Sequence, residues 1–401
     1  MTDDDVTIET DSVLPPLDDL SGCRVQVVGV APPIRRQLAR LLAALGIRAI
    51  DFADDGDAAW QQLLGKGVDL VLIDQAQGAG NGYCRRLRLD GKSRRLPVLM
   101  VLEHDRPADR SAAFRAGATD LVVLPILGPE VVARVRSHLE NRLLIRDLEA
   151  ALGQIGQDLD LARRMQLDLL PTREDLDGVE AETGLRVQVH FQPSAQIGGD
   201  FWALHRLSGG RTGISLVDFA GHGVTAALNT FRLHAVMSES PPDGLDPAGY
   251  LSLLNDRLVD LLPPGQFATM SFLVIDGRQG VLSFAGAGAT SPIVANPGPG
   301  VLDCSGLPLG IKKDVVYQTG RIPFSQEAAL LLYSDAVTES PDRQGRCLGT
   351  ADLEVWVERC RSRHGFAGIV ADFLAVRQPL ADDLTLLHVC RGGVGCRDDR
   401  A

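Results

Sequence analysis

The first third of the chain alternates between short apolar runs and segments with helical spacing. The apolar runs predict buried strands at Arg24–Gly29, Asp69–Asp74, Pro97–Leu102 and Leu121–Leu124. The helical spacing falls at residues 34–45 and 82–89 and in a segment that closes at residues 114–117. Strands separated by helices form βα units, so we expect an α/β domain over residues 22–127, with a doubly wound parallel sheet covered on both faces.

The next segment, residues 128–170, predicts one long linker helix. Its apolar residues follow alternating spacings of 3 and 4, which is a heptad seam made of Ile145, Leu148, Leu152, Ile155, Leu159 and Ala162. A helix with one apolar stripe buries that stripe against a partner, so the pattern favours a coiled coil and a homodimer. Packing of the helix on its own domain is the alternative.

From Leu185 to Val389 the pattern changes to short alternating strands separated by glycine-rich turns. Two stretches, about Val224–Met237 and Pro247–Leu262, have helical spacing. Because strands dominate, this pattern predicts an α+β sandwich, which we place at residues 171–392.

Composition and charge narrow the class of protein. A length of 401 residues suggests two or three domains at about 100–200 residues each, and 45% hydrophobic residues exclude wholesale disorder. The 52 acidic residues outnumber the 40 basic ones, and seven of the acids lie in residues 1–20, so residues 1–21 are expected to be a disordered acidic tail. Residues 393–401 are expected to be a second tail.

The same composition argues against two kinds of partner. The net charge of −12 argues against a nucleic-acid-binding surface, which needs a basic stripe, so no nucleic-acid binding is expected. No apolar run approaches the ~18 residues of a membrane span, and the acidic N-terminus does not resemble a signal peptide. We therefore expect a cytoplasmic protein without membrane contact.

Two aspartates are expected to face each other across a hairpin. The turn at Gly209-Gly210 makes the numbers of paired residues sum to about 418 or 419, which places Asp200 opposite Asp218 or its neighbour. Carboxylates that face each other repel unless one is protonated or a cation lies between them. A divalent metal ion resolves this repulsion.

Further acids lie at the ends of other buried strands. Asp335 follows the apolar run at residues 328–333, and the pair Asp382-Asp383 precedes the run at residues 384–389. Carboxylates at such positions cost desolvation free energy, so we expect them to converge on a positive charge. An oxygen-only set of this kind suits Mg²⁺ or Mn²⁺, whereas helix capping and turns are the alternative role for each aspartate alone.

These motifs resemble the metal-dependent type 2C (PPM) serine/threonine phosphatases of the bacterial SpoIIE/RsbU kind. The resemblance covers about residues 160–390 and rests on the segments Gly198-Gly199-Asp200-Phe201-Trp202, Val217–Gly223, Tyr333–Glu339 and Asp382–Leu386. It implies an αββα sandwich and two divalent metal ions, Mn²⁺ or Mg²⁺. The ions activate a water for in-line attack on phosphorus without a phosphoenzyme.

The resemblance also implies a role for each matching residue. Asp218 and Asp335 would be catalytic, with Asp218 bridging both metals. The implied metal ligands are Asp200, Asp218, the carbonyl of Phe219, Asp335 and Asp382, with Asp383 as the alternative to Asp382. His222 is a candidate acid for the leaving alkoxide, and a structural role in its tight loop is the alternative.

The segment 22–127 resembles response-regulator receiver domains, with Asp74 at the position that accepts phosphate. Gly29-Val30 replace the acidic pair that binds Mg²⁺, Leu102 replaces the switch hydroxyl, and Leu124 replaces the lysine. A carboxylate without metal or lysine does not readily overcome the repulsion of a phosphoryl donor. We therefore expect a degenerate receiver used for docking or dimerisation, with phosphorylation of Asp74 as the alternative.

Together these resemblances imply a protein phosphatase that acts on phosphoserine or phosphothreonine. The expected substrate is a phosphorylated anti-sigma-factor antagonist of the STAS kind in a partner-switching circuit. One alternative is a non-catalytic signalling scaffold, which the filled ligand positions disfavour. The other is a phosphatase gated by phosphorylation of Asp74, which the missing receiver residues disfavour.

Overall fold

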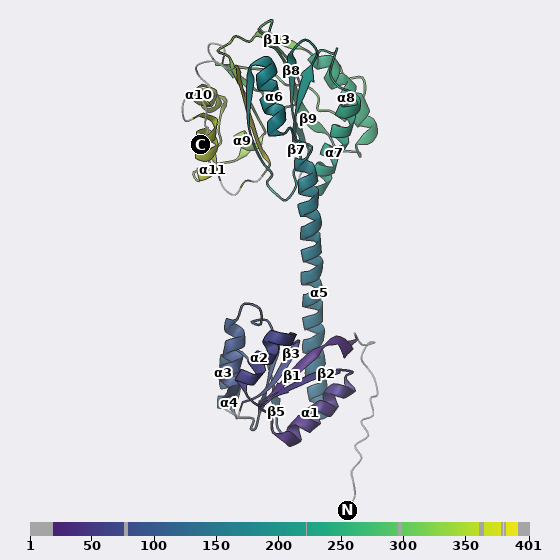
Figure 1. Cartoon of the computed structure of the whole chain (residues 1–401), viewed down its shortest axis with the longest axis vertical. Coiled ribbons are helices and arrows are strands. Elements are labelled where there is room, and N and C mark those ends of the chain that lie inside the picture. Colours follow the sequence, from purple (N-terminus) through teal and green to yellow (C-terminus); the bar gives the residue numbers. More distant parts are fainter. Residues whose placement is uncertain are drawn as a thin grey trace, which may run out of the picture. The chain divides into compact units, whose positions relative to one another are not determined.

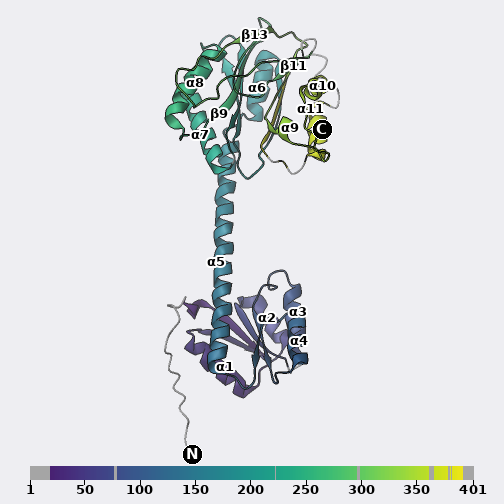
Figure 2. The same ribbon diagram turned by 180° about the vertical axis from the view of Figure 1, so that it is seen from behind.

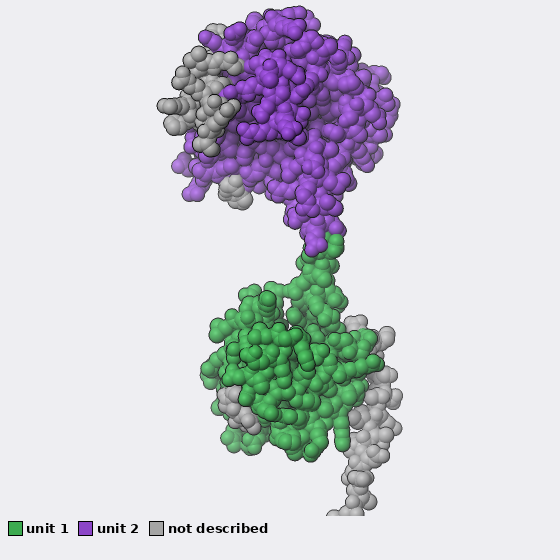
Figure 3. Space-filling model, in the orientation of Figure 1, with its two compact units in different colours: residues 1–154 green, residues 155–401 purple. Residues whose placement is uncertain are grey.

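The computed structural model describes residues 19–75, 79–221, 223–295, 299–360, 365–377, 380 and 382–391. Contacts within the chain divide it into two compact units, residues 1–154 and 155–401 (Figure 3). Three of the expectations above lie outside the described residues: the tail over residues 1–18, the tail over residues 393–401, and His222.

The first unit is built on a five-stranded parallel sheet with the order β2-β1-β3-β4-β5. Its strands are β1 (Arg24–Val28), β2 (Ala49–Ala53), β3 (Leu70–Asp74), β4 (Val98–Leu102) and β5 (Asp120–Val123). Its helices are η1 (Leu20–Gly22), α1 (Pro32–Ala44), α2 (Gly56–Lys66), α3 (Ala79–Leu89), α4 (Pro107–Ala116) and the start of α5 (Gly128–Leu167). Helices α1 and α5 cover one face of the sheet, and α2, α3 and α4 cover the other, which confirms the doubly wound fold (Figure 1).

Two parts of this unit differ from the sequence prediction. Strand β2 and helix α2 were not predicted. Strand β2 lies at the edge of the sheet and four of its five residues are only partly buried, so its sequence has no continuous apolar run. Leu20 also does not belong to the tail expected over residues 1–21, because it is buried in the core of the first unit.

The amino-terminal turns of α5 belong to the core of the first unit. Val131, Val135 and Leu139 are buried against the same apolar cluster as α1. The first turns of the predicted linker helix therefore belong to the first unit. The predicted range, residues 128–170, is close to the observed range of α5, Gly128–Leu167.

The second unit contains two five-stranded sheets. One has the order β13-β10-β9-β8-β7 and the other has the order β12-β11-β14-β15-β6. The strands are β6 (Leu185–Gln192), β7 (Asp200–Leu207), β8 (Arg211–Phe219), β9 (Ala268–Asp276), β10 (Val281–Ala287), β11 (Ile293–Ala295), β12 (Pro299–Val301), β13 (Gly320–Pro323), β14 (Ala329–Tyr333) and β15 (Leu384–Arg391). All the pairings given for these strands are antiparallel.

The further helices of this unit are α6 (Arg173–Thr183), α7 (Val224–Glu239), α8 (Pro247–Leu261), α9 (Ala336–Glu339), α10 (Thr350–Cys360) and α11 (Gly365–Val376). Val179 of α6 belongs to the apolar cluster between the sheets, so α6 does not cover an outer face. Helices α7 and α8 pack on the sheet that contains β8, and α10 and α11 pack on the sheet that contains β14 (Figure 2). A third apolar cluster fills the space between the sheets. These layers confirm the αββα sandwich.

The prediction of two helices in this unit was incomplete. Helices α7 and α8 lie where the helical spacing places them, whereas α6, α9, α10 and α11 are additional. The missed helices are short, at 4 to 12 residues, so their apolar spacing repeats too few times to stand out from the neighbouring strands. Within the described part of the chain, no helix is both long and apolar enough to span a bilayer.

Candidate metal centre

The hairpin of β7 and β8 places two aspartates opposite each other. Asp200 is the register partner of Asp218, which confirms the pairing expected from the turn. Gly209 and Gly210 in that turn have φ angles of 79° and 75°, a left-handed conformation that glycine adopts without a steric penalty. The turn residues therefore set the register that brings the two carboxylates together.

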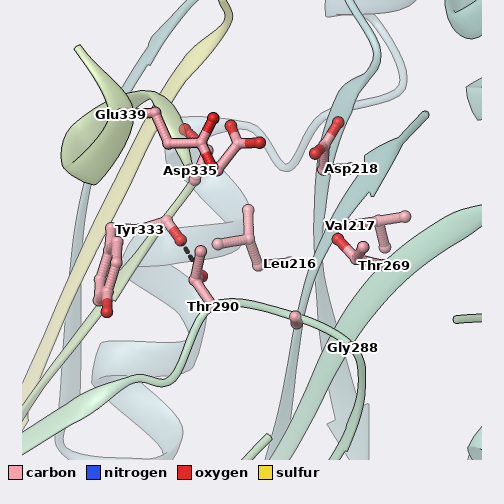
Figure 4. Close-up of a pocket in the computed structure, with 11 residues that line it drawn as sticks. Leu216, Val217, Asp218, Thr269, Gly288, Thr290, Tyr333, Asp335 and Glu339 are labelled. Atoms are coloured by element: carbon pink, nitrogen blue, oxygen red, sulfur yellow. Dashed lines mark hydrogen bonds between the residues drawn. The ribbon is translucent and has the colours of Figure 1, made fainter. Parts of the chain in front are cut away.

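Asp218 lies at the edge of a cavity with a volume of about 320 Å³. Asp335 and Glu339 face Asp218 from the opposite side of this cavity (Figure 4). The other lining residues are Leu216, Val217, Thr269, Gly288, Ala289, Thr290, Tyr333 and Ser334. Among the residues that the structure describes, no lysine, arginine or histidine lines the cavity.

The acids of this cavity destabilise one another's ionised forms. Burial, followed by the charges of Asp335 and Asp382, raises the pKa of Asp218 from 3.8 to about 8. Burial, followed by the charges of Asp382 and Glu339, raises the pKa of Asp335 from 3.8 to about 6. The cavity therefore concentrates negative charge that a bound cation would stabilise.

The donor set fits a hard divalent cation. Carboxylate, hydroxyl and carbonyl oxygens are the ligands that Mg²⁺ and Mn²⁺ prefer, and Mg²⁺ usually keeps several waters. Among the described residues, no group of three or more Asp, Glu, His or Cys side chains is placed to hold one ion. An ion at this cavity would therefore take few ligands from the protein and complete its coordination with water or substrate.

Of the predicted ligands, Asp218 and Asp335 line the cavity, whereas Asp200, Phe219, Asp382 and the alternative Asp383 do not. Asp200 is 2% exposed, and its carboxylate accepts a hydrogen bond from the hydroxyl of Thr385. Burial, followed by the charge of Asp218, raises the pKa of Asp200 well above its usual value. Phe219 is also buried, and its carbonyl oxygen lies 3.0 Å from the position that a Cβ would occupy at Gly199. This close approach explains why residue 199 is a glycine.

The two adjacent acids that the sequence left open have different surroundings in the structure. Asp383 is buried and accepts hydrogen bonds from the backbone nitrogens of Ser194 at 2.7 Å, Gly199 at 2.6 Å and Asp200 at 3.3 Å, and from the Ser194 hydroxyl at 3.0 Å. Asp382 is exposed, and its carboxylate accepts a bond from the backbone nitrogen of Asp383. This geometry favours Asp382 as the ligand and gives Asp383 the task of holding the Gly198–Asp200 turn.

The sequence analysis missed the contributions of two residues. Glu339 lies four residues after Asp335, one turn along α9, and that spacing could have placed it on the same face. Gln166, near the end of α5, is 1% exposed, and its side-chain amide donates to the carbonyl of Gly198 at 2.7 Å and accepts from its nitrogen at 3.2 Å. The end of α5 is thus bonded directly to the turn that carries Asp200.

The candidate phosphate acceptor of the first unit has different surroundings. Asp74 ends β3, and its side chain is partly buried. In the neighbouring strands, Gly29-Val30 directly follow β1 and Leu102 ends β4, and both Val30 and Leu102 are buried. The structure therefore places apolar side chains at the strand ends where a receiver domain carries its metal-binding acids and its switch hydroxyl.

Comparisons with known families agree with both folds. Residues 208–392 match the model of the family described as Stage II sporulation protein E (SpoIIE). Residues 25–136 match the model of the response regulator receiver domain. The two matches fall in the second and the first compact unit respectively.

Individual proteins show the same similarity over parts of the chain. The phosphoserine phosphatase RsbP of Bacillus subtilis (strain 168) is 25% identical over 190 residues, which are 46% of this chain and 45% of RsbP. The phosphoserine phosphatase RsbU of the same strain is 26% identical over 246 residues, which are 59% of this chain and 71% of RsbU. The chain thus spans less than half the length of RsbP.

A solved structure supports the fold of the second unit. The SiaA-PP2C domain of Pseudomonas aeruginosa superimposes with a TM-score of 0.52 and 24% sequence identity. The match covers 60% of this chain and 98% of that domain. At this identity the similarity shows a shared fold.

Proposed function

Because the chain joins a response-regulator receiver domain to a domain of the SpoIIE phosphatase family, we propose that it is a metal-dependent protein serine/threonine phosphatase. The observation that carries this proposal is the cavity in which Asp218 faces Asp335 and Glu339, with no cationic side chain among its described lining residues. Repulsion between these acids is a cost to the fold that divalent cations would offset.

Each residue of the centre has an assigned task in this proposal. Asp218 would contact both ions, Asp335 would hold one of them together with the exposed Asp382, and Asp200 would act on the other through water because its carboxylate is buried. The Phe219 carbonyl would supply one more oxygen. Two divalent cations bound there would lower the pKa of a water and neutralise charge on the phosphoryl oxygens. Asp383 would keep the Gly198–Asp200 turn in place.

The proposed substrate is phosphoserine or phosphothreonine on a signalling protein. RsbP and RsbU are both named phosphoserine phosphatases, which supports this substrate class. By the same similarity we propose a phosphorylated anti-sigma-factor antagonist with a STAS domain as the physiological substrate.

Hydrolysis of p-nitrophenyl phosphate and of a phosphorylated STAS-domain protein tests the proposal. We expect activity with Mn²⁺ or Mg²⁺, none in EDTA, and a fall of at least about 100-fold in Asp218→Asn and Asp335→Asn, because even partners of metal ligands cost about 10–100-fold. Asp177→Asn is the matched control, since this carboxylate is exposed on α6. Hydrolysis that survives EDTA and Asp218→Asn would refute the metal mechanism. Complete inactivity of the wild type with both metals would favour a non-catalytic scaffold.

We further propose that α5 forms a homodimer. Ile145, Leu148, Leu152 and Ile155 of the heptad seam are 43–60% exposed in the single chain. An apolar stripe of this length gains about 25 cal/mol for each Å² that a second copy covers. Sedimentation of the full chain at micromolar concentration should show a dimer that Leu148→Glu/Leu152→Glu dissociates and Ala150→Glu does not. A monomeric wild type contradicts the proposal.

A further inference from the structure

The first unit contains a basic cavity of about 380 Å³ at the edge of the sheet opposite Asp74. Its walls come from α3, from the segments that precede β4 and β5, and from α5. The lining residues are Arg88, Arg94, Arg95, Leu96, Pro97, Gly117, Ala118, Thr119, His138, Asn141, Arg142 and Ile145. Because β4 and β5 are parallel to β3, their amino ends lie away from the strand end that carries Asp74.

The cavity collects positive charge in a chain whose net charge is −12. The segment from Arg85 to Arg95 alone contains six basic residues and one acid. Four guanidinium groups line the cavity, and the side chain of His138 adds a ring nitrogen that contacts Asp120 at 3.1 Å. Neither the receiver fold nor the proposed phosphatase reaction requires this charge.

One of the four arginines is a structural clamp. Arg88 donates from Nε to the carbonyl of Gly117 at 2.8 Å and from Nη1 to the carbonyl of Leu96 at 2.8 Å. Its Nη2 donates to the Thr119 hydroxyl at 3.0 Å. All these acceptors are neutral, so Arg88 joins the walls of the cavity while its positive charge is not compensated by a carboxylate.

The other arginines leave binding capacity open. The Nε of Arg142 is buried and has no hydrogen-bond partner, which is costly for a charged donor. Arg95 pairs with Glu149 at 2.8 Å, but both side chains are more than half exposed, so this pair contributes little and can rearrange. Among the described residues, no salt bridge engages Arg88, Arg94 or Arg142. The cavity thus holds more cations than nearby acids neutralise.

We propose that this cavity binds a phosphate-bearing small molecule of nucleotide size. Arginine forks match phosphate oxygens in paired hydrogen bonds, and the positive charge of Arg88 would gain an anionic partner besides its neutral acceptors. Leu96, Pro97 and Ala118 supply apolar surface beside the charged groups, as a base or sugar requires. The volume lies at the lower end of the range for small-ligand sites, which is about 300–1,000 Å³.

Isothermal titration calorimetry of the full chain in EDTA tests this site with ATP, GTP, pyrophosphate and adenosine as probes. We expect one of the phosphate-bearing probes to bind with one site per chain and adenosine not to bind. Arg142→Gln and Arg94→Gln should each weaken that binding at least tenfold, whereas Arg85→Gln should not, because Arg85 is exposed on α3 but does not line the cavity. Rising salt concentration should weaken binding in the wild type.

The outcomes distinguish a nucleotide from a simple phosphate as the ligand, and they test this cavity independently of the proposed phosphatase activity. Tighter binding of ATP or GTP than of pyrophosphate supports a nucleotide, and equal binding supports recognition of the phosphates alone. Failure of all three phosphate probes, or binding that Arg94→Gln and Arg142→Gln leave unchanged, overturns the proposal. Arg94 is exposed, so Arg94→Gln remains a test if Arg142→Gln does not fold. EDTA removes the metals of the second unit, so the result does not depend on phosphatase activity.

Discussion

The two units of this protein both place aspartates at the ends of buried strands, with opposite surroundings. In the first unit, Asp74 follows β3, and the neighbouring strand ends carry the buried apolar residues Val30 and Leu102. In the second unit, Asp218 near the end of β8 faces Asp335 and Glu339 across a cavity. A single carboxylate at a strand end is thus found beside apolar side chains, whereas the second unit gathers several carboxylates together.

The two units differ in the electrostatic cost of their aspartates. One carboxylate at a partly exposed strand end can be solvated by water. Several carboxylates around one cavity raise one another's pKa values because their charges repel. This repulsion lowers the stability of the fold unless a bound cation offsets it. The second unit therefore has the electrostatic signature of a cation site, while the first unit has lost the residues that would make one.

The largest expected effect separates the adjacent acids Asp382 and Asp383. Asp383→Ala removes the acceptor of four hydrogen bonds in a buried turn, so we expect the second unit to lose about 2–4 kcal/mol of unfolding free energy. Asp382→Ala removes an exposed carboxylate whose charge repels Asp218 and Asp335, so it should not lower that stability, whereas it should abolish metal-dependent hydrolysis. Chemical denaturation of both variants measures the difference.

The opposite pattern would change the assignment of the ligand. If Asp382→Ala unfolds the second unit and Asp383→Ala leaves its stability intact, Asp383 has no structural role and becomes the candidate for metal binding. Asp382→Asn and Asp383→Asn provide isosteric checks, because each retains one side-chain oxygen acceptor.

A smaller effect is expected on the melting temperature of each unit when one aspartate is replaced in the absence of metal. In EDTA at pH 8, Asp218→Asn should raise the melting temperature of the second unit by about 2–4 °C, the shift that corresponds to roughly 1 kcal/mol. The reason is that the amide removes one of the charges that repel Asp335. Asp74→Asn should produce no comparable gain in the first unit. Calorimetry of the full chain can follow both units.

The gain from Asp218→Asn should depend on pH in a defined direction. The pKa of Asp218 in the folded protein is about 8, above its ordinary value of 3.8, so between these values the folded state binds more protons than the unfolded state. The stability of the metal-free protein therefore falls as pH rises through this window. The gain should be larger at pH 8 than at pH 5, and a gain that grows toward low pH would contradict the charge repulsion described here.

The smallest expected effect is at Asp74. Incubation with beryllofluoride or acetyl phosphate and Mg²⁺ should leave the first unit unchanged, because Gly29-Val30 and Leu102 supply neither metal ligand nor hydroxyl. Mass spectrometry and amide hydrogen exchange are the measurements. Stoichiometric modification of Asp74, or an exchange response that Asp74→Ala abolishes, would revive the phosphorylation-gated enzyme.

The sequence by itself was sufficient where local rules apply. The parallel sheet followed from apolar runs separated by helical spacing, and the pairing of Asp200 with Asp218 followed from the turn at Gly209-Gly210. It failed for β2, whose edge position leaves its residues partly exposed, and for the short helices α10 and α11. In those elements the pattern is too weak or too short to separate from its neighbours.

Only the tertiary structure could decide which acids meet. Asp382 and Asp383 are equivalent in the sequence, and the choice between them depends on donors from Ser194 and Gly199, almost two hundred residues away. The buried link from Gln166 to Gly198 and the unpartnered Nε of Arg142 likewise depend on segments brought together by folding. The spacing of apolar residues shows which face of a helix or strand is buried. It does not show which side chains from other elements pack against that face, because those elements are remote in the sequence.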